Sequence, residues 1–258
     1  MASLDPSALV LSVAAATAAG LMGPFALMRR MTLASDAISH IALPGIGLAI
    51  LLHFQPIVGA VVMLLLGALL IWALERETRI ATETVIGVVF TTALAAGSLI
   101  TKGEDLVEAL LGGVHGLGPV ETASAVVVSL AVVAFVVVSR HALVLSLVSA
   151  DIARTAGVRV ARLDLRFLFL FALTIALGLR YLGVLLMGAL VIIPAATAKR
   201  VARGLGEMLA VSVVVSIAST VAGVLVAASM RREPGPIVVL AAAACFFASL
   251  LVPRRWHE

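Results

Sequence analysis

Residues 31–53 read MTLASDAISHIALPGIGLAILLH. This stretch places an aspartate, Asp36, and a histidine, His40, four residues apart inside an apolar run. On a helix this spacing puts both side chains on one face, one turn apart. Pro44 and Gly45 follow directly, and such a pair predicts a broken helix, which membrane proteins tolerate where the freed carbonyls face a cavity or other protein.

The composition of the chain is that of a membrane protein. Its 258 residues are 62% apolar and only 12% charged, whereas soluble domains have about 25% charged residues. Its mean hydropathy is +1.21. We therefore expect an all-α, polytopic integral membrane protein whose residues 1–258 form a single transmembrane domain.

Apolar runs of about 17–25 residues are long enough to cross a bilayer, and they predict eight or nine transmembrane helices. The runs are 7–28, 34–53, 56–74, 82–101, 119–139, 167–181, 183–198, 207–229 and 236–252. The sixth and seventh runs are short and could form one bent or re-entrant pair. Pro194 predicts a second broken helix. Gly178, Gly183 and Gly188 predict a surface on which helices pack closely.

The arginines predict the orientation of the chain. With nine spans and the N-terminus outside, fourteen of the eighteen basic residues become cytoplasmic, namely Arg29, Arg30, Arg76, Arg79, Arg140, Arg154, Arg159, Arg162, Arg166, Lys199, Arg200, Arg203, Arg254 and Arg255. Because basic residues favour the cytoplasmic side, the C-terminus and the longest polar interruption, residues 140–166, are expected there too. No basic run with interleaved aromatic residues indicates nucleic-acid binding.

Residues 140–166 contain the signals of a short helix. Ser149 is a suitable N-cap, and Gly157 is a suitable residue to end a helix that runs through Thr155. A compact helical loop of this kind can serve as a docking point for another protein. It can equally be a connector with an amphipathic face.

Asp36 and His40 offer two interpretations. An ionisable residue inside a membrane is costly, by about 3 kcal/mol for an aspartate at a helix centre, so its presence indicates a pathway or a site. A carboxylate and a neutral imidazole together suit a divalent ion such as zinc or manganese. Two ligands do not complete a site, but a two-fold dimer would supply four. Alternatively, Asp36 and His40 satisfy each other, or a neighbouring helix, by hydrogen bonding.

Motifs of catalysis are missing from the sequence. It contains no GxxxxGK[ST] phosphate loop, no HExxH and no GxSxG with a suitable triad. We therefore expect a protein that is not an enzyme and has no cofactor. If nucleotide drives transport, its binding machinery belongs to another chain.

Four stretches of the chain together resemble the permease subunits of ABC importers for zinc, manganese and iron, the ABC-3 family. They are RRMTLASDAISHIALPG (29–45), SADIARTAGVRV (149–160), YLGVLLMGALVIIPAATAKRVAR (181–203) and REPGPIVVL (232–240). The first and third are the most specific. The sequence departs from the family in the outer loop, where LLGGVHG has Gly113 at a position that is often acidic or serine, so the resemblance does not extend a metal role to this loop. His115 in this loop is either a ligand or a mobile loop histidine.

The resemblance implies a role for particular residues and partners. Asp36 and His40 would line the metal pathway, and the segment with Ser149, Asp151, Arg154 and Gly157 would couple the permease to its ATPase. The protein would be a homodimer in the bacterial inner membrane, surrounded by lipid, with ATPase subunits on the cytoplasmic side and a metal-binding delivery protein outside.

The expected function is the permease of an ABC importer for a divalent transition metal, zinc or manganese and possibly iron. The alternative is an ion-coupled secondary carrier that acts without an ATPase, since broken helices and a buried aspartate suit that class as well. A membrane-embedded metalloenzyme is less favoured, because a third protein ligand and a general base are missing near Asp36 and His40.

Overall fold

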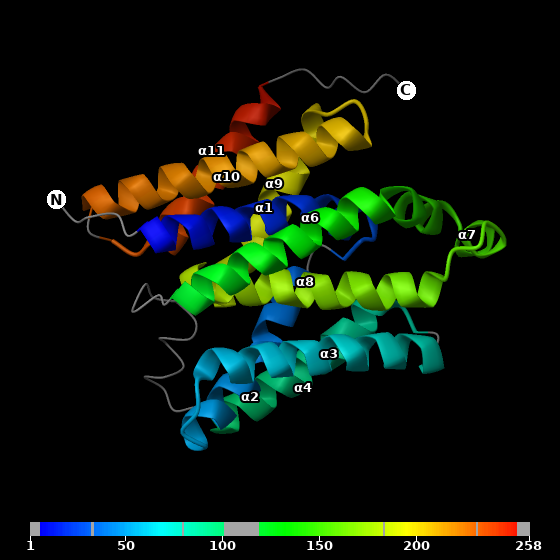
Figure 1. The fold of residues 1–258 in the computed structure, drawn as a ribbon, viewed down its shortest axis with the longest axis horizontal. Helices are drawn as coiled ribbons and strands as arrows, with labels where there is room; N and C mark the ends of the chain where they lie inside the picture. The colour runs from blue at the N-terminus through cyan, green and yellow to red at the C-terminus, as the bar shows by residue number, and fades with distance from the viewer. Residues whose placement is uncertain are drawn as a thin grey trace.

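The computed structural model describes residues 6–31, 34–78, 80–100, 119–182, 184–230 and 232–251, and its regular elements there are all helices. Figure 1 shows them as one bundle. They are α1 (Pro6–Met28), α2 (Ala34–Leu51), α3 (Pro56–Thr78), α4 (Thr82–Ile100), α6 (Pro119–Val148), α7 (Ala150–Thr155), α8 (Val160–Leu182), α9 (Val184–Val201), α10 (Leu205–Met230) and α11 (Pro234–Leu250). The expected all-α polytopic architecture is confirmed.

Proline residues set where several of these helices begin. Pro6, Pro56, Pro119 and Pro234 are the first residues of α1, α3, α6 and α11. Proline suits this position because its fixed φ matches the helix and because the N–H that it lacks would have no partner in the first turn. Within the described ranges, α1, α2, α3, α4, α6 and α10 are long and apolar enough to span a membrane, and α11 is a shorter apolar helix.

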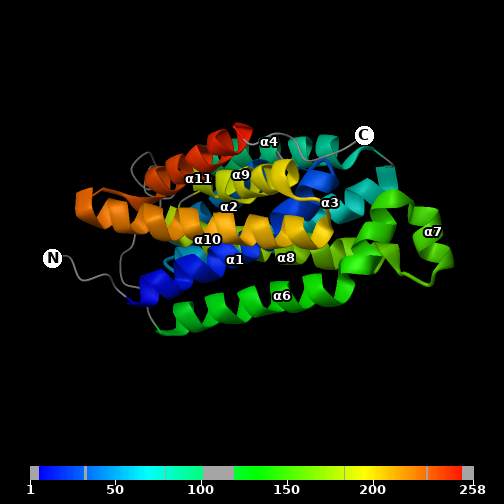
Figure 2. The same cartoon turned by 90° about the horizontal axis from the view of Figure 1, so that it is seen from above.

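The bundle has a buried centre and an exposed periphery. In the apolar 18-residue window of each helix, 72% of the α1 window and 67% of the α2 window are buried. Only 22% of the α6 window is buried. α9 is also central, because it packs against α1, α2, α8, α10 and α11. Figure 2 shows α6 on one side of the bundle and α4 and α11 on the other. Successive long helices run in alternating directions, and α7 lies at the end opposite the N-terminus (Figure 1).

Residues 140–166 are more helical than expected. α6 continues past the predicted span 119–139 to Val148, and α8 begins at Val160, seven residues before the predicted span 167–181. At 1.5 Å per residue the 30 residues of α6 measure about 45 Å, longer than a hydrocarbon core of about 30 Å. Arg140 and Arg166 therefore end the apolar runs but not the helices. α8 and α9 are separate long helices rather than a short re-entrant pair.

The expected breaks at Pro44–Gly45 and Pro194 are wrong. α2 continues through Pro44, and α9 continues through Pro194. A proline inside a helix removes one hydrogen bond, here to the carbonyl of His40 or of Leu190, but the neighbouring i to i−4 bonds remain. Close packing by neighbouring helices keeps each helix continuous. Membrane helices tolerate proline where their surroundings satisfy the freed backbone groups.

Candidate functional site

Asp36 and His40 share one face of α2, as their spacing predicts. Asp36 is in the first turn of the helix and is exposed. His40 is half-buried one turn further on, where its ring is tilted against that of Phe90 in α4, with 5.5 Å between the ring centroids. The carboxylate therefore reaches the surface of the bundle, and the imidazole lies in the wall between α2 and α4.

The two side chains keep capacity for a ligand. The Nδ1 atom of His40 is buried and has no hydrogen-bond partner in the described part of the chain. The ion pairs found among the described residues join Arg29 to Asp164 and Arg154 to Asp151, so the Asp36 carboxylate belongs to neither of them. A buried imidazole nitrogen without a partner is unfavourable by itself, and it is a typical metal ligand.

Glycines of three neighbouring helices allow α2 to pack closely against them. A Cβ atom on Gly188 of α9 would lie 3.0 Å from the Cβ and 3.1 Å from the Cα of Asp36. A Cβ on Gly97 of α4 would lie 3.2 Å from the nitrogen of Pro44, and Gly59 of α3 packs directly on the backbone of Gly45. Small residues permit such close backbone approach in membranes. The predicted close-packing role is thus confirmed for Gly188, whereas Gly178 faces the side chain of Met187 in α9, and Gly183 lies outside the described residues.

In the described part of the chain, two metal-ligating side chains, those of Asp36 and His40, share this face of α2. Among the described residues no group of three or more His, Cys, Asp and Glu side chains lies close enough to hold a metal. A carboxylate oxygen and an imidazole nitrogen can bind a borderline divalent ion, but a tetrahedral zinc site needs four ligands. The exposure of Asp36 leaves room for further ligands from outside this chain.

The other histidines have different surroundings. His53 has a φ of 57° and follows α2, where the N–H of Phe54 donates to the carbonyl of Ala49 and that of His53 to the carbonyl of Ile50. This is the Schellman ending of a helix, so His53 acts as a helix cap. His141 is exposed on α6. His115 and Gly113 lie outside the described residues.

The short helix predicted within residues 140–166 is present as α7, with both predicted ends. The Ser149 side chain accepts a hydrogen bond from the N–H of Ile152 at 3.3 Å. Gly157, with a φ of 80°, ends the helix, because the N–H of Val158 donates to the carbonyl of Ala153. Ala153 is buried, while Asp151, Ile152 and Arg154 are exposed, and Asp151 pairs with Arg154 at 2.8 Å.

The helix that follows α7 is fixed to the bundle by two side chains. Arg29, at the end of α1, pairs with Asp164 of α8 at 2.8 Å, and its guanidinium lies 4.5 Å from the ring centroid of Phe167. The Nε1 atom of Trp72 in α3 donates to the carbonyl of Ala161 at 2.9 Å. Neither contact could be found from sequence spacing, and neither could the packing of Phe90 on His40, because each joins segments far apart in the chain.

The fold is an all-α bundle of apolar helices with a polar pair on a central helix, which is the architecture of a polytopic membrane protein. The model of the ABC 3 transport family matches residues 4–253. The chain therefore belongs to the ABC 3 transport family, and it is the non-catalytic membrane subunit of an ABC importer. A permease of this kind works with an ATPase and a substrate-binding protein.

Several characterised proteins are similar over nearly their whole length. The high-affinity zinc uptake system membrane protein ZnuB of Haemophilus influenzae is 30% identical, over 91% of this chain and 92% of ZnuB. The manganese import system permease protein ScaB of Streptococcus parasanguinis is 28% identical, over 98% and 91%. The solved structure "PsaBC from Streptococcus pneumoniae in complex with Fab" superposes with a TM-score of 0.82 at 27% identity, covering 95% of this chain and 90% of that chain.

Proposed function

We propose that this chain forms the membrane pathway of an importer for a divalent transition metal, zinc or manganese and possibly iron, and that Asp36 and His40 bind the ion in transit. The proposal rests on the pair formed by Asp36 and His40. One exposed carboxylate and one imidazole, whose Nδ1 has no hydrogen-bond partner among the described residues, lie on the same face of a central helix. Relatives named for zinc, manganese and iron transport support this class of cargo.

The ligand count favours a homodimer. One chain offers two ligands, and two copies related by a two-fold axis would offer four if their Asp36 residues faced each other. Asp36 is exposed in the single chain and its backbone rests on Gly188 of α9, so the surface formed by α2 and α9 is our proposed dimer contact at the pathway. A site shared between two subunits can open by a small movement of one subunit against the other, which suits release of the ion.

We further propose a bacterial inner-membrane orientation with the N-terminus outside and both the C-terminus and α7 in the cytoplasm. Arg76 near the end of α3, Arg140 in α6 and Arg162 near the start of α8 belong to helix ends that point toward α7 in Figure 1. Basic residues concentrate on the cytoplasmic side of membrane proteins. This supports the cytoplasmic assignment of residues 140–166.

In this orientation α7 is our proposed contact with the ATPase. Ser149 and Gly157 fix its two ends, and Asp151, Arg154 and the 53%-exposed Ile152 form its outer surface. A short helix with fixed ends moves as a rigid piece. Its attachment to α6 and α8 would pass movement of the ATPase to the bundle, so that ATP binding shifts the population between outward-open and inward-open states.

The test is reconstitution in liposomes. We would measure ATP-dependent uptake of radioactive zinc and manganese by this chain with its ATPase and delivery protein, and by the chain alone under a proton or sodium gradient. The proposal predicts uptake only with the partner proteins and ATP, and the preferred ion identifies the cargo. Gradient-driven uptake by the chain alone would instead identify a secondary carrier and would overturn the proposal.

A further inference from the structure

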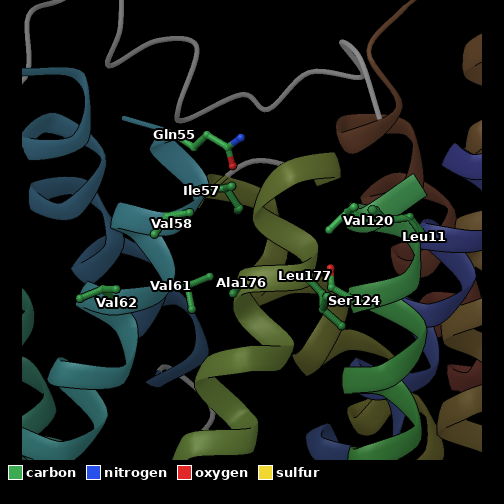
Figure 3. A pocket seen from close by; sticks show the side chains of 10 residues that line it. All are labelled: Leu11, Gln55, Ile57, Val58, Val61, Val62, Val120, Ser124, Ala176 and Leu177. Carbon is green, nitrogen blue, oxygen red and sulfur yellow. The ribbon is translucent and has the colours of Figure 1, made fainter. Parts of the chain in front are cut away.

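An apolar groove lies between α3 and α6, at the end of the bundle away from α7. Val58 and Val62 of α3 line one side of it and Val120 and Ser124 of α6 line the other (Figure 3). Ala176 of α8, which is 5% exposed, closes its base. The volume of this α3–α6 groove is about 310 Å³.

The α3–α6 groove is separate from the metal pathway. Asp36 packs on α9, and His40 packs on Phe90 of α4. α4 lies on the opposite side of the bundle from α6 (Figure 2). A ligand in the groove would therefore not be the transported ion, whichever metal the protein carries.

The groove opens onto the apolar outer surface of the bundle. Val58 is 47% exposed, Val62 51% and Val120 79%, and these side chains continue the apolar outer surfaces of α3 and α6, two helices that qualify as membrane spans. α3 begins at Pro56, so Val62 lies about 10 Å along the helix at 1.5 Å per residue. This places the groove in the first part of the hydrocarbon layer, where the upper half of an acyl chain lies.

Hydrocarbon is the occupant that the chemistry of the groove fits. Eight of the ten residues that line the groove are apolar, so it offers few of the two to four polar partners that a bound water needs. Leaving the groove empty would forfeit the dispersion contacts of every side chain that lines it. Gln55 is exposed beside the outer end of the groove (Figure 3), where its amide can both donate and accept hydrogen bonds.

We propose that the α3–α6 groove binds one acyl chain of a phospholipid from the surrounding bilayer, with the ester and headgroup region beside Gln55. The bound chain fills the space between α6 and α3. α6 is the least buried of the described membrane-span helices, and it leads directly into α7. The lipid thus supports the helix that carries α7.

The test uses a phospholipid with a photoreactive diazirine in its acyl chain. The assembled importer is reconstituted with this lipid and irradiated, and the adducts are located by peptide mass spectrometry. We expect adducts to concentrate several-fold on Val58, Val62 and Val120, compared with Leu66 and Leu70, which are exposed further along α3. Equal labelling of the groove and of these reference residues would overturn the proposal, since it would indicate bulk lipid only.

A matched pair of variants tests whether the groove itself holds the lipid. Ser124→Phe places an aromatic ring in the groove, whereas Ala123→Phe places the same ring on the adjacent exposed residue of α6, which does not line it. Displacing about two methylene groups should lower lipid occupancy about tenfold in Ser124→Phe, with little change in Ala123→Phe. Ala176→Leu fills the groove from α8 and should act like Ser124→Phe. Equal phospholipid retention in all three, measured by native mass spectrometry, would contradict the proposal.

A second copy of the chain is the competing occupant. Val58→Cys in a Cys245→Ala background would then form disulfide-linked dimers, whereas a lipid-filled groove leaves this thiol free for a membrane-soluble maleimide. We expect maleimide labelling without dimers, and cross-linking of the copies through Val58→Cys would overturn the lipid assignment.

Discussion

The Nη1 atom of Arg29 lies 2.8 Å from Oδ1 of Asp164, and the same guanidinium lies 4.5 Å from the ring centroid of Phe167. The contact joins the end of α1, which leads to Asp36 in α2, with the beginning of α8, which follows α7. The Arg29 and Asp164 side chains are 13% and 30% exposed, so the pair is partly sheltered from water. It joins the segment that precedes the proposed metal-binding helix to the helix that follows the proposed ATPase contact.

Asp164→Asn should destabilise the protein, because it leaves the Arg29 cation sheltered without its counter-charge. We expect a loss of about 1–3 kcal/mol of unfolding free energy, measured as a lower thermal midpoint in detergent. Asp151→Asn is the matched control, because it breaks an ion pair of the same 2.8 Å length whose side chains are 65% and 88% exposed. Exposed ion pairs contribute little to stability. Equal destabilisation by both changes would therefore show that burial does not determine how much the Arg29–Asp164 pair contributes.

Gly188→Ala should impair transport through its contact with Asp36. The added Cβ would lie 3.0–3.2 Å from three atoms of Asp36, so α2 or α9 must move by a few tenths of an ångström. We expect several-fold slower metal uptake and a larger loss with Gly188→Val. Gly87→Ala in α4 is the control, because no atom lies within 4 Å of its added Cβ. Unchanged uptake in Gly188→Val would refute a role for this contact.

The residues that end α1 and α7 share a left-handed backbone, but one is an arginine and the other a glycine. Exchanging the residue type at each position should therefore have opposite effects on stability. Arg30 has a φ of 59° in the position that Gly157 occupies with a φ of 80°. An L-residue with a side chain is strained there by about 1 kcal/mol. Arg30→Gly should therefore raise the thermal midpoint, and Gly157→Ala should lower it. A lower thermal midpoint in Arg30→Gly would mean that the Arg30 side chain stabilises the protein by more than its backbone strain destabilises it.

Ser149→Ala should weaken the coupling of ATP hydrolysis to transport. It removes the side-chain bond to the N–H of Ile152, and loss of an N-cap costs about 1 kcal/mol, which is large for a helix of six residues. We expect fewer metal ions transported per ATP hydrolysed, and rescue by Ser149→Thr, which keeps a capping oxygen. A normal ratio of transported metal to hydrolysed ATP in Ser149→Ala would show that the capping of α7 does not affect coupling.

The elements that the sequence predicted well are those decided by local chemistry. Ser149 and Gly157 marked both ends of α7 because capping needs particular side chains at fixed places. Apolar length located the membrane helices. By contrast, Arg140 and Arg166 ended apolar runs without ending helices, so the bounds of α6 and α8 were wrong.

Contacts between distant segments could not be predicted in this way. Pro44 was expected to break α2, but Gly97 and the other neighbours pack around it and the helix continues. The spacing of Asp36 and His40 predicted their shared face, whereas the exposure of one and the packing of the other on Phe90 depend on α4 and α9. Only the folded chain brings those helices together.

The most direct test of the account is metal uptake by site variants in the complete reconstituted importer. Asp36→Asn and His40→Ala should each reduce ATP-driven uptake of radioactive zinc and manganese to background while the complex remains assembled, because each removes a metal ligand. His53→Asn should transport normally, since asparagine also adopts the left-handed backbone of a helix cap. Near-normal uptake in both Asp36→Asn and His40→Ala would contradict the assignment of the metal pathway to this face of α2.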